Sequence, residues 1–263
     1  MATGLRIAFV WIAVTFLAAC ATSGGETDAR RTGSAVERVS PVRAAELNTR
    51  LGVGYLERGE IQIAMQKLEL AVEQDPQHVP AHLALGIVYQ RIDRVDRALE
   101  HFRTAVRLAP GDGGAHNSYA ALLCQTGRYE QADREFRAAL EDPFYATPAT
   151  ALANAGSCAR RDGRDQDAQR YLREALGFDP TNQTALFNLA MLAFAAGNPL
   201  QARAFLQRLE AAGGLGARSL LLAVRVERML GSMDMAQRYA DQLLERYPNT
   251  PQASEVRFEI DDD

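Results

Sequence analysis

The sequence predicts an all-α protein built from a row of similar helix pairs. A pattern of seven residues in the segment 51–76 returns 34 residues further on, in the segment 85–110. Within each unit, apolar residues recur at the three- and four-residue spacing of a helix, and no segment competes with the alternating pattern of a strand. A fixed period of this length indicates that each unit is one supersecondary element in an array.

The residues at the seven positions identify the kind of repeat. They are Leu51, Gly52, Tyr55, Ala64, Leu68, Ala71 and Pro76 in the first unit, and Leu85, Gly86, Tyr89, Ala98, Phe102, Ala105 and Pro110 in the second. This pattern resembles the tetratricopeptide repeat, a helix–turn–helix unit. The resemblance implies a right-handed superhelix of about six repeats with a C-terminal capping helix.

The expected repeats follow one another from about residue 45 to residue 250. In the first repeat, Leu47, Leu51 and Tyr55 form an apolar face on the first helix, and Gly59 permits the turn to the second helix. Pro76 ends that second helix, because proline lacks an N–H donor and disfavours helix at the preceding residue. The repeats occupy residues 45–78, 79–112, 113–142, the segment around Gly156, 183–216 and 217–250, and residues 251–260 are the expected capping helix.

The period slips once, between the third and fourth repeats. Gly156 follows its counterpart Ala120 by 36 residues, which places two extra residues in the connection 142–148. Phe144 and Tyr145 are adjacent aromatic residues in that connection. The sequence leaves two interpretations open: the rings fill the gap that the insertion creates, or they contact a partner.

The N-terminus has the character of a targeting segment. Residues 7–16 form an uncharged apolar run, which is too short for a bilayer core that needs about 20 apolar residues. The tetrapeptide Leu-Ala-Ala-Cys that ends at Cys20 resembles a bacterial lipobox, in which the cysteine thiol receives diacylglycerol. We therefore favour a lipoprotein signal peptide at residues 1–19, with lipidation of Cys20, over an ordinary secretory signal.

The segment after Cys20 is polar. Residues 20–40 are rich in Gly, Ser, Thr and charged residues, so they cannot bury enough apolar surface to offset the entropy of ordering. We expect a flexible tether there, followed by a repeat domain at residues 41–263. In the lipoproteins that the lipobox resembles, aspartate after the cysteine favours the inner membrane, so Ala21 implies the periplasmic face of the outer membrane.

The composition and motifs argue against nucleic-acid binding and against catalysis. The net charge is −4, whereas a nucleic-acid binder shows a basic face. His82 and His116 occupy equivalent positions in adjacent repeats, but no cysteine or carboxylate is obviously placed to complete a metal site, so we interpret both as packing residues. Because no phosphate-binding glycine loop or nucleophile motif is present in the sequence, we predict no enzyme, no metal and no cofactor.

Two further cysteines lie on the first helices of neighbouring repeats. Cys124 belongs to the third repeat and Cys158 to the fourth, and these helices pack side by side in the expected fold. An oxidising periplasm permits a disulfide if the two Cα atoms lie within about 7 Å of each other. The sequence leaves a disulfide and a pair of buried thiols equally open.

The inner face of the array is the expected partner-binding surface. In the repeat family this face is built from fixed positions of each first helix, and here those positions are largely apolar with one basic patch. Such a groove suits a peptide or a helix, with arginine binding a carboxylate or a carbonyl; the alternative is that the arginines are only solvated. The predicted residues are Asn117, Ala121, Gln125, Ser157, Arg160, Arg161, Phe187 and Met191, with Phe144 and Tyr145 of the connection.

The region after the third repeat carries a more specific resemblance. Its stretch Glu-Asp-Pro-Phe-Tyr-Ala-Thr-Pro, followed by Ala151, Asn154, Ala155, Gly156, Cys158 and Ala159, is similar to the type IV pilus biogenesis proteins called PilW or PilF. The resemblance implies an outer-membrane lipoprotein that acts as a pilotin: it binds the pilus secretin and promotes its localisation and multimerisation. The alternative is a repeat scaffold of another envelope assembly, such as a tight-adherence pilus or a peptidoglycan-enzyme adaptor.

Overall fold

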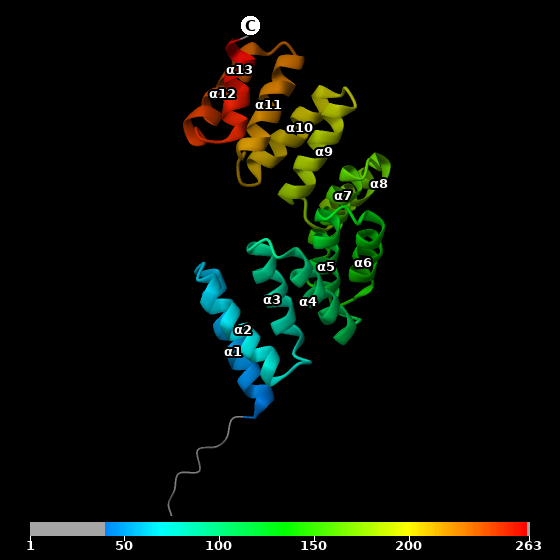
Figure 1. Cartoon of the computed structure of the whole chain (residues 1–263). Coiled ribbons are helices and arrows are strands. Elements are labelled where there is room, and N and C mark those ends of the chain that lie inside the picture. The colour runs from blue at the N-terminus through cyan, green and yellow to red at the C-terminus, as the bar shows by residue number, and fades with distance from the viewer. Residues whose placement is uncertain (1–39, 262–263) are drawn as a thin grey trace, which may run out of the picture. The chain divides into compact units, whose positions relative to one another are not determined.

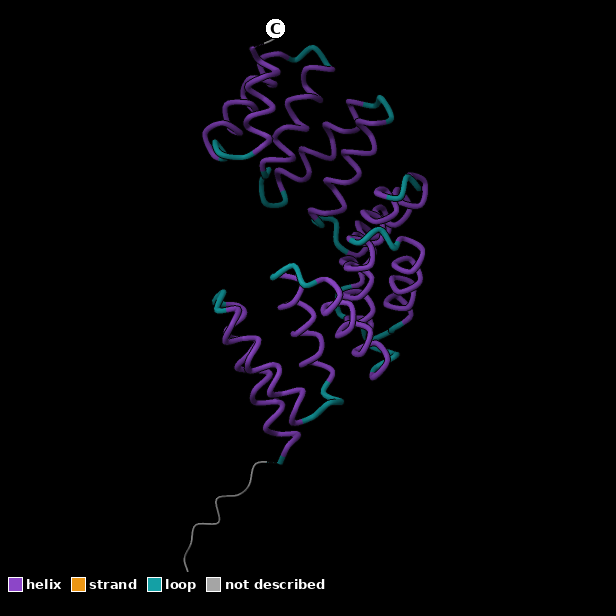
Figure 2. The backbone as a smooth tube through the Cα atoms, viewed as in Figure 1, coloured by secondary structure: helices purple, strands orange, loops and turns teal. Residues whose placement is uncertain are grey.

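The computed structural model describes residues 40–261, and every regular element in that range is an α-helix (Figures 1 and 2). The predicted signal peptide, Cys20 and nearly all of the predicted tether lie outside the described residues. None of the helices in the described range is long and apolar enough to cross a membrane. In chain order these helices are α1 (Pro41–Glu57), α2 (Ile61–Gln74), α3 (Val79–Arg91), α4 (Val95–Leu108), α5 (Gly113–Gln125), α6 (Tyr129–Glu141), α7 (Pro148–Arg161), α8 (Asp165–Phe178), α9 (Gln183–Ala195), α10 (Pro199–Ala211), α11 (Ala217–Met229), α12 (Met233–Arg246) and α13 (Pro251–Asp261).

The helices pack as six successive pairs, from α1 with α2 to α11 with α12. The second helix of each pair also contacts the first helix of the next pair, so the pairs form a continuous stack (Figure 1). First helices of neighbouring pairs contact each other directly at α1 and α3, α5 and α7, α7 and α9, and α9 and α11. Helix α13 packs on α11 and α12, which confirms the expected capping helix.

Each pair turns through one residue with left-handed backbone conformation. In the first pair this is Gly59, with φ of 77°, and in the second pair it is Asp93, with φ of 57°. A short polar side chain such as that of aspartate tolerates this conformation better than most. The residues at this position are Gly59, Asp93, Gly127, Gly163, Gly197 and Gly231. They lie 34 residues apart except across the third connection, where the spacing is 36, and this confirms the predicted slip.

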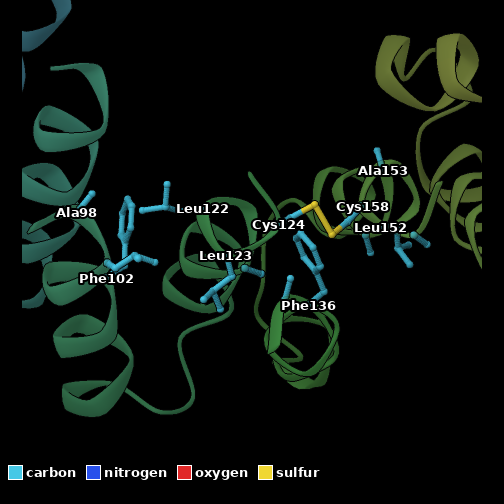
Figure 3. Close-up of a cluster of buried hydrophobic side chains, with 14 of the residues drawn as sticks. Ala98, Phe102, Leu122, Leu123, Cys124, Phe136, Leu152, Ala153 and Cys158 are labelled. Carbon is cyan, nitrogen blue, oxygen red and sulfur yellow. A yellow bond between two sulfur atoms is a disulfide. The ribbon is translucent and has the colours of Figure 1, made fainter. Parts of the chain in front are cut away.

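The small residues of the repeated pattern allow the two helices of a pair to approach closely. A Cβ atom added to Gly86 on α3 would lie 2.5 Å from a ring carbon of Phe102 on α4, so only glycine fits there without a shift. Phe102 is itself buried, between the fully buried Ala98 and Ala105. Figure 3 shows the Phe102 ring with Ala98 and Leu122 around it. The repeated pattern is therefore a packing pattern, as predicted.

The predicted apolar face of α1 is wrong in its orientation. Leu47 and Leu51 remain 48% and 42% exposed, and the buried residues of this helix are instead Ala45, Thr49, Gly52 and Leu56. The physical reason is close packing: a Cβ atom on Gly52 would meet Leu68 of α2 at 2.5 Å, so the small residues face the neighbouring helices. Leu47 and Leu51 are left toward solvent, whereas Tyr55, the third residue of the predicted face, is partly buried against the core.

Ion pairs join the helices at the C-terminal end of the array. Arg203 of α10 donates a hydrogen bond of 2.8 Å from Nε to Glu227 of α11, and its Nη2 also contacts the same carboxylate and Ser232. Arg225 of α11 pairs with Glu255 and Glu259 of α13. These contacts fix α11, which carries part of the groove described next.

Candidate partner-binding groove

A cavity lies between the first helices of the fourth, fifth and sixth pairs. It has a volume of about 460 Å³. Helix α7 contributes Ser157, Arg160 and Arg161; the other lining residues, mostly from α9 and α11, include Thr184, Phe187, Asn188, Arg218 and Ser219. Four of the predicted partner-binding residues, namely Ser157, Arg160, Arg161 and Phe187, thus come together at one site.

Arg160 is held in a fixed orientation at this cavity. Its Nε atom donates a hydrogen bond of 2.8 Å to Oδ1 of Asn188 on α9. The amide of Asn188, which is only 5% exposed, is fixed in turn by a hydrogen bond of 2.8 Å from Nδ2 to the carbonyl of Thr184. Burial lowers the pKa of the Arg160 guanidinium, and the nearby charges of Arg218 and Arg161 lower it further, against the opposing charge of Asp165. The interpretation of Arg160 as only solvated is therefore wrong, because the side chain is half-buried and held by Asn188.

A second, more apolar cavity of about 160 Å³ shares two residues with the first. The shared residues are Phe187 and Arg218, and the guanidinium of Arg218 lies 5.2 Å from the centre of the Phe187 ring. The remaining lining includes Met191 and Phe194 of α9 and Leu221 of α11. We call the two cavities together the α7–α9–α11 groove. It has a basic end and an apolar end.

The predicted residues of the third repeat lie outside this groove. Asn117 accepts a hydrogen bond of 3.1 Å from Asn154 of α7, and Gln125 accepts one of 2.8 Å from Gln90 of α3. Ala121 is partly buried on α5. Asn117 and Gln125 therefore join neighbouring first helices through their side chains, and neither these two nor Ala121 line either cavity of the α7–α9–α11 groove.

The two aromatic residues of the connection between α6 and α7 have different surroundings. Tyr145 is partly buried against α5, where its side chain occupies the space that a Cβ atom on Gly113 would need. Phe144, in contrast, is 91% exposed. Asp142 anchors the connection by accepting hydrogen bonds from the backbone N–H groups of Gly113 and Phe144, which lower the pKa of its carboxyl. Tyr145 fits the gap-filling interpretation, and Phe144 is free for a partner.

Cys124 and Cys158 form a disulfide between α5 and α7 (Figure 3). Their Cα atoms are 5.8 Å apart, and both residues are buried next to Phe136 in the apolar core. Cys158 lies one turn before Arg161, so the bond fixes the helix that forms one wall of the groove. Of the two interpretations that the sequence left open, the structure has the disulfide.

The buried histidines contact residues of their own repeats rather than each other. His82 Nε2 lies 3.0 Å from the carbonyl of Pro76, and because a carbonyl can only accept, this nitrogen carries the proton. His82 Nδ1 then accepts from Nδ1 of His101, at 3.0 Å. At the equivalent place in the third repeat, His116 Nδ1 lies 2.6 Å from Glu135. Among the described residues, no group of three or more His, Cys, Asp or Glu side chains could hold a metal ion.

The His82–His101 pair makes the second repeat sensitive to acid. Burial lowers the pKa of His101, and the neighbouring His82 and Arg97 lower it further, against the opposing charges of Glu100 and Glu69. Between that lowered pKa and the ordinary value near 6.5, the unfolded chain binds more protons than the folded chain. Stability is therefore fully present above about pH 6.5 and is lost as the pH falls toward the folded-state pKa.

We expect His101→Glu to remove this loss, because it removes the ring whose pKa is lowered and places a carboxylate opposite His82. The third repeat has this arrangement, since Glu135 lies opposite His116 there. The measurement is the melting temperature between pH 7.5 and pH 5.5. The wild type should fall further over this range than His101→Glu, and His78→Gln, outside the pair, should behave as the wild type. Equal falls in all three proteins would contradict the prediction.

Comparison with known protein families identifies the type of repeat. Two tetratricopeptide repeat models match the chain, one over residues 49–113 and 120–183 and the other over residues 159–223. The chain is a tetratricopeptide repeat protein. The matches extend from α1 into α11, over the helix pairs that form the groove, which confirms the predicted fold class.

This tetratricopeptide repeat protein is homologous to two type IV pilus proteins. Type IV pilus assembly protein PilF of Pseudomonas aeruginosa is 28% identical, over 97% of this chain and 99% of its own length. The crystal structure of PilW, described as a widely conserved type IV pilus biogenesis factor, superimposes with a TM-score of 0.75 at 28% identity, over 81% of this chain and 97% of its own. The structure of Pseudomonas aeruginosa PilF gives 0.73 at 28% identity, over 83% and 99%.

Two functional residues of the α7–α9–α11 groove, Asn188 and Arg218, were not predicted from the sequence. Asn188 interrupts the apolar run of α9, and a polar residue inside such a run is a signal that could have been used. Arg218 lies in the first turn of α11, in the least regular repeat, where no pattern distinguishes it from other surface arginines. Its position over Phe187 depends on how α9 and α11 pack, which the repeat pattern does not specify.

Proposed function

We propose that this tetratricopeptide repeat protein is a lipid-anchored scaffold of the outer membrane that binds the secretin of a type IV pilus and promotes its multimerisation there. The observation that carries the proposal is the full-length similarity to PilF, which includes the region of Cys20 as well as the repeats. Homology to PilF and PilW supports a scaffold role in type IV pilus biogenesis.

The proposed mechanism needs a binding surface and an anchor, and no catalytic group. The α7–α9–α11 groove and the exposed Phe144 are the proposed contacts with the secretin subunit. An acyl chain on Cys20 contributes about 0.8 kcal/mol per buried CH₂ group to membrane binding. Tethering raises the effective concentration of the scaffold at the membrane where the secretin assembles, without any new contact.

Cys20→Ser in the native bacterium tests the anchor. We expect the variant to leave the outer-membrane fraction and the amount of secretin multimer to fall, because the cysteine thiol that accepts the lipid is gone. The measurements are membrane fractionation and the multimer band on a denaturing gel, compared with a strain lacking the protein. If secretin multimers persist at the wild-type level in the strain that lacks the protein, the proposed function is wrong.

Phe144→Ser tests the contact with the partner, and Phe178→Ser is its matched control. Phe144 is 91% exposed in the connection before α7, and Phe178 is 62% exposed at the end of α8. We expect Phe144→Ser to reduce the secretin recovered by crosslinking in native envelopes, with an unchanged melting temperature, and Phe178→Ser to change neither. Equal recovery with all three proteins would remove Phe144 from the partner-binding site.

A further inference from the structure

Three arginines line the α7–α9–α11 groove, and the charge of Asp165, which lines neither cavity, offsets that of Arg160 only in part. Among the described residues, Arg160, Arg161 and Arg218 form no ion pair, and no aspartate or glutamate lines either cavity of the groove. Two other arginines in this half of the chain do form ion pairs: Arg164 contacts Asp162, and Arg225 contacts Glu255. Arg160 is half-buried, whereas Arg161 and Arg218 are exposed. Because a partly buried charge without an ion pair is unfavourable, Arg160 with two further cations beside it is typical of a site that receives an anion.

The orientation of Arg160 supports an anionic ligand. Asn188 occupies its Nε atom, and the structure gives the two terminal nitrogens no partner. The Asn188 side chain is itself buried and fixed by the carbonyl of Thr184. The terminal nitrogens of an arginine form the fork that binds a carboxylate through two parallel hydrogen bonds. The fixed guanidinium at the cavity is thus prepared for a carboxylate before any ligand arrives.

The second cavity indicates that the ligand has an apolar group next to its anionic group. Arg218 and Phe187 line both cavities, so a ligand that spans them passes directly from basic to apolar surroundings. Met191, Phe194 and Leu221 surround the apolar end. Free phosphate has no apolar part to place there, whereas a polypeptide with acidic and apolar side chains has both. Three cations also exceed the charge of one carboxylate, which favours more than one acidic residue.

We infer that the α7–α9–α11 groove binds a segment of a partner polypeptide in which aspartate or glutamate side chains lie next to large apolar side chains. The carboxylates contact Arg160, Arg161 and Arg218, and an apolar side chain enters the cavity formed by Phe187, Met191 and Phe194. This inference rests on the proposed function, since the segment belongs to the partner that the scaffold holds.

Fluorescence anisotropy with defined peptides tests the inference. The probe is a short labelled peptide of alternating Asp and Leu with an amidated C-terminus, and its control is the corresponding Asn–Leu peptide. With the purified full chain in detergent, we expect the Asp–Leu peptide to bind at least about tenfold more tightly. That factor corresponds to one charge-assisted hydrogen bond.

Variants of the arginines locate the binding. We expect Arg160→Gln with Arg161→Gln, and separately Arg218→Gln, to weaken binding of the Asp–Leu peptide about tenfold or more. Arg173→Gln is the matched control, because Arg173 is exposed on α8 and lines neither cavity. Because Arg160 is half-buried and forms no ion pair, its replacement should leave the melting temperature unchanged or raised, whereas replacement of a merely structural arginine would lower it.

Four results would overturn the inference. The first is equal affinity for the Asp–Leu and Asn–Leu peptides, and the second is a loss of affinity in Arg173→Gln as large as in the groove variants. The third is tighter binding of an Asn–Leu peptide with a free C-terminal carboxylate than of the Asp–Leu peptide. The fourth is binding of the Asp–Leu peptide only after removal of residues 261–263. The last would mean that the acidic tail of this chain itself occupies the groove. Because the assay contains no secretin, the peptide result and the secretin-multimer result can fail independently.

Discussion

Replacing both Cys124 and Cys158 with alanine is expected to lower the free energy of unfolding by about 3 to 4 kcal/mol. The disulfide joins residues separated by 34 positions, and closing a loop of that length removes entropy from the unfolded chain. For a domain of this size the change corresponds to a fall of roughly 6 to 16 °C in melting temperature. The measurement is thermal and denaturant unfolding of the two proteins without reductant.

A reductant provides the control for the disulfide prediction. Adding it should lower the melting temperature of the wild type toward that of the double alanine variant and leave the variant unchanged. Thiol titration of denatured, unreduced protein carrying Cys20→Ser then counts only Cys124 and Cys158. Two free thiols in that titration would show that the bond is absent from the isolated protein.

The loss of the disulfide should also weaken binding at the α7–α9–α11 groove. Cys158 precedes Arg160 and Arg161 on α7, and the bond attaches this helix to α5 across the connection that holds the two inserted residues. Asp142 and Tyr145 also attach this connection to α5, so the alanine variant should remain folded at room temperature. We therefore expect weaker binding of the acidic peptide in the double variant.

The fold was predictable because one packing requirement is repeated along the chain. Gly52 faces Leu68, Gly86 faces Phe102 and Gly156 faces Leu172, so a small residue on the first helix meets a bulky residue 16 positions later on the second. The spacing between repeats also places the left-handed turn residues, and it identified the insertion before α7. Fold prediction thus depended on local contacts within each repeat, which the sequence specifies directly.

The orientation of α1 was not predictable by the same reasoning. Leu47 and Leu51 look like a core stripe when only hydrophobicity is counted, but Ala45 and Gly52 are small enough to let α1 approach its neighbours. Size decided the orientation, and periodicity alone does not distinguish a small-residue stripe from a large-residue stripe. The two exposed leucines are a consequence of that close approach.

The groove was predictable only in part, because it depends on contacts between repeats. Arg160, Arg161 and Phe187 were found from their positions on the first helices. Asn117 and Gln125 of α5, in contrast, join neighbouring helices and line neither cavity. Asn188 and Arg218 complete the basic end through their relation to Arg160 and Phe187. Such relations depend on how three helices pack, which a repeat pattern read one unit at a time does not contain.

Arg203→Ala is expected to lower the free energy of unfolding by about 3 kcal/mol, because it leaves the carboxylate of Glu227 buried without its counter-charge. Glu227 is only 3% exposed, and the Nε atom of Arg203 donates to it at 2.8 Å. We expect the lower end of the range for buried pairs, since the Arg203 side chain keeps 29% of its surface exposed. Denaturant unfolding of the variant and the wild type measures the difference.

The double variant Arg203→Met with Glu227→Met separates the cost of an unpaired charge from the contribution of the pair. Apolar side chains of similar size remove both charges together, so its stability should return close to that of the wild type. Arg173→Ala on α8 is the exposed control and should stay within about 0.5 kcal/mol of the wild type. A double variant as unstable as Arg203→Ala would contradict this account of the pair.

The ion pair also connects stability to binding through α11. Glu227 and Arg218 lie on the same helix, so the pair between α10 and α11 helps to fix the arginine that lies over Phe187. At a temperature where Arg203→Ala is still mostly folded, we expect its affinity for the acidic peptide to fall, and the double methionine variant to recover it. Unchanged affinity in Arg203→Ala would mean that contacts of α11 other than this pair are sufficient to position Arg218.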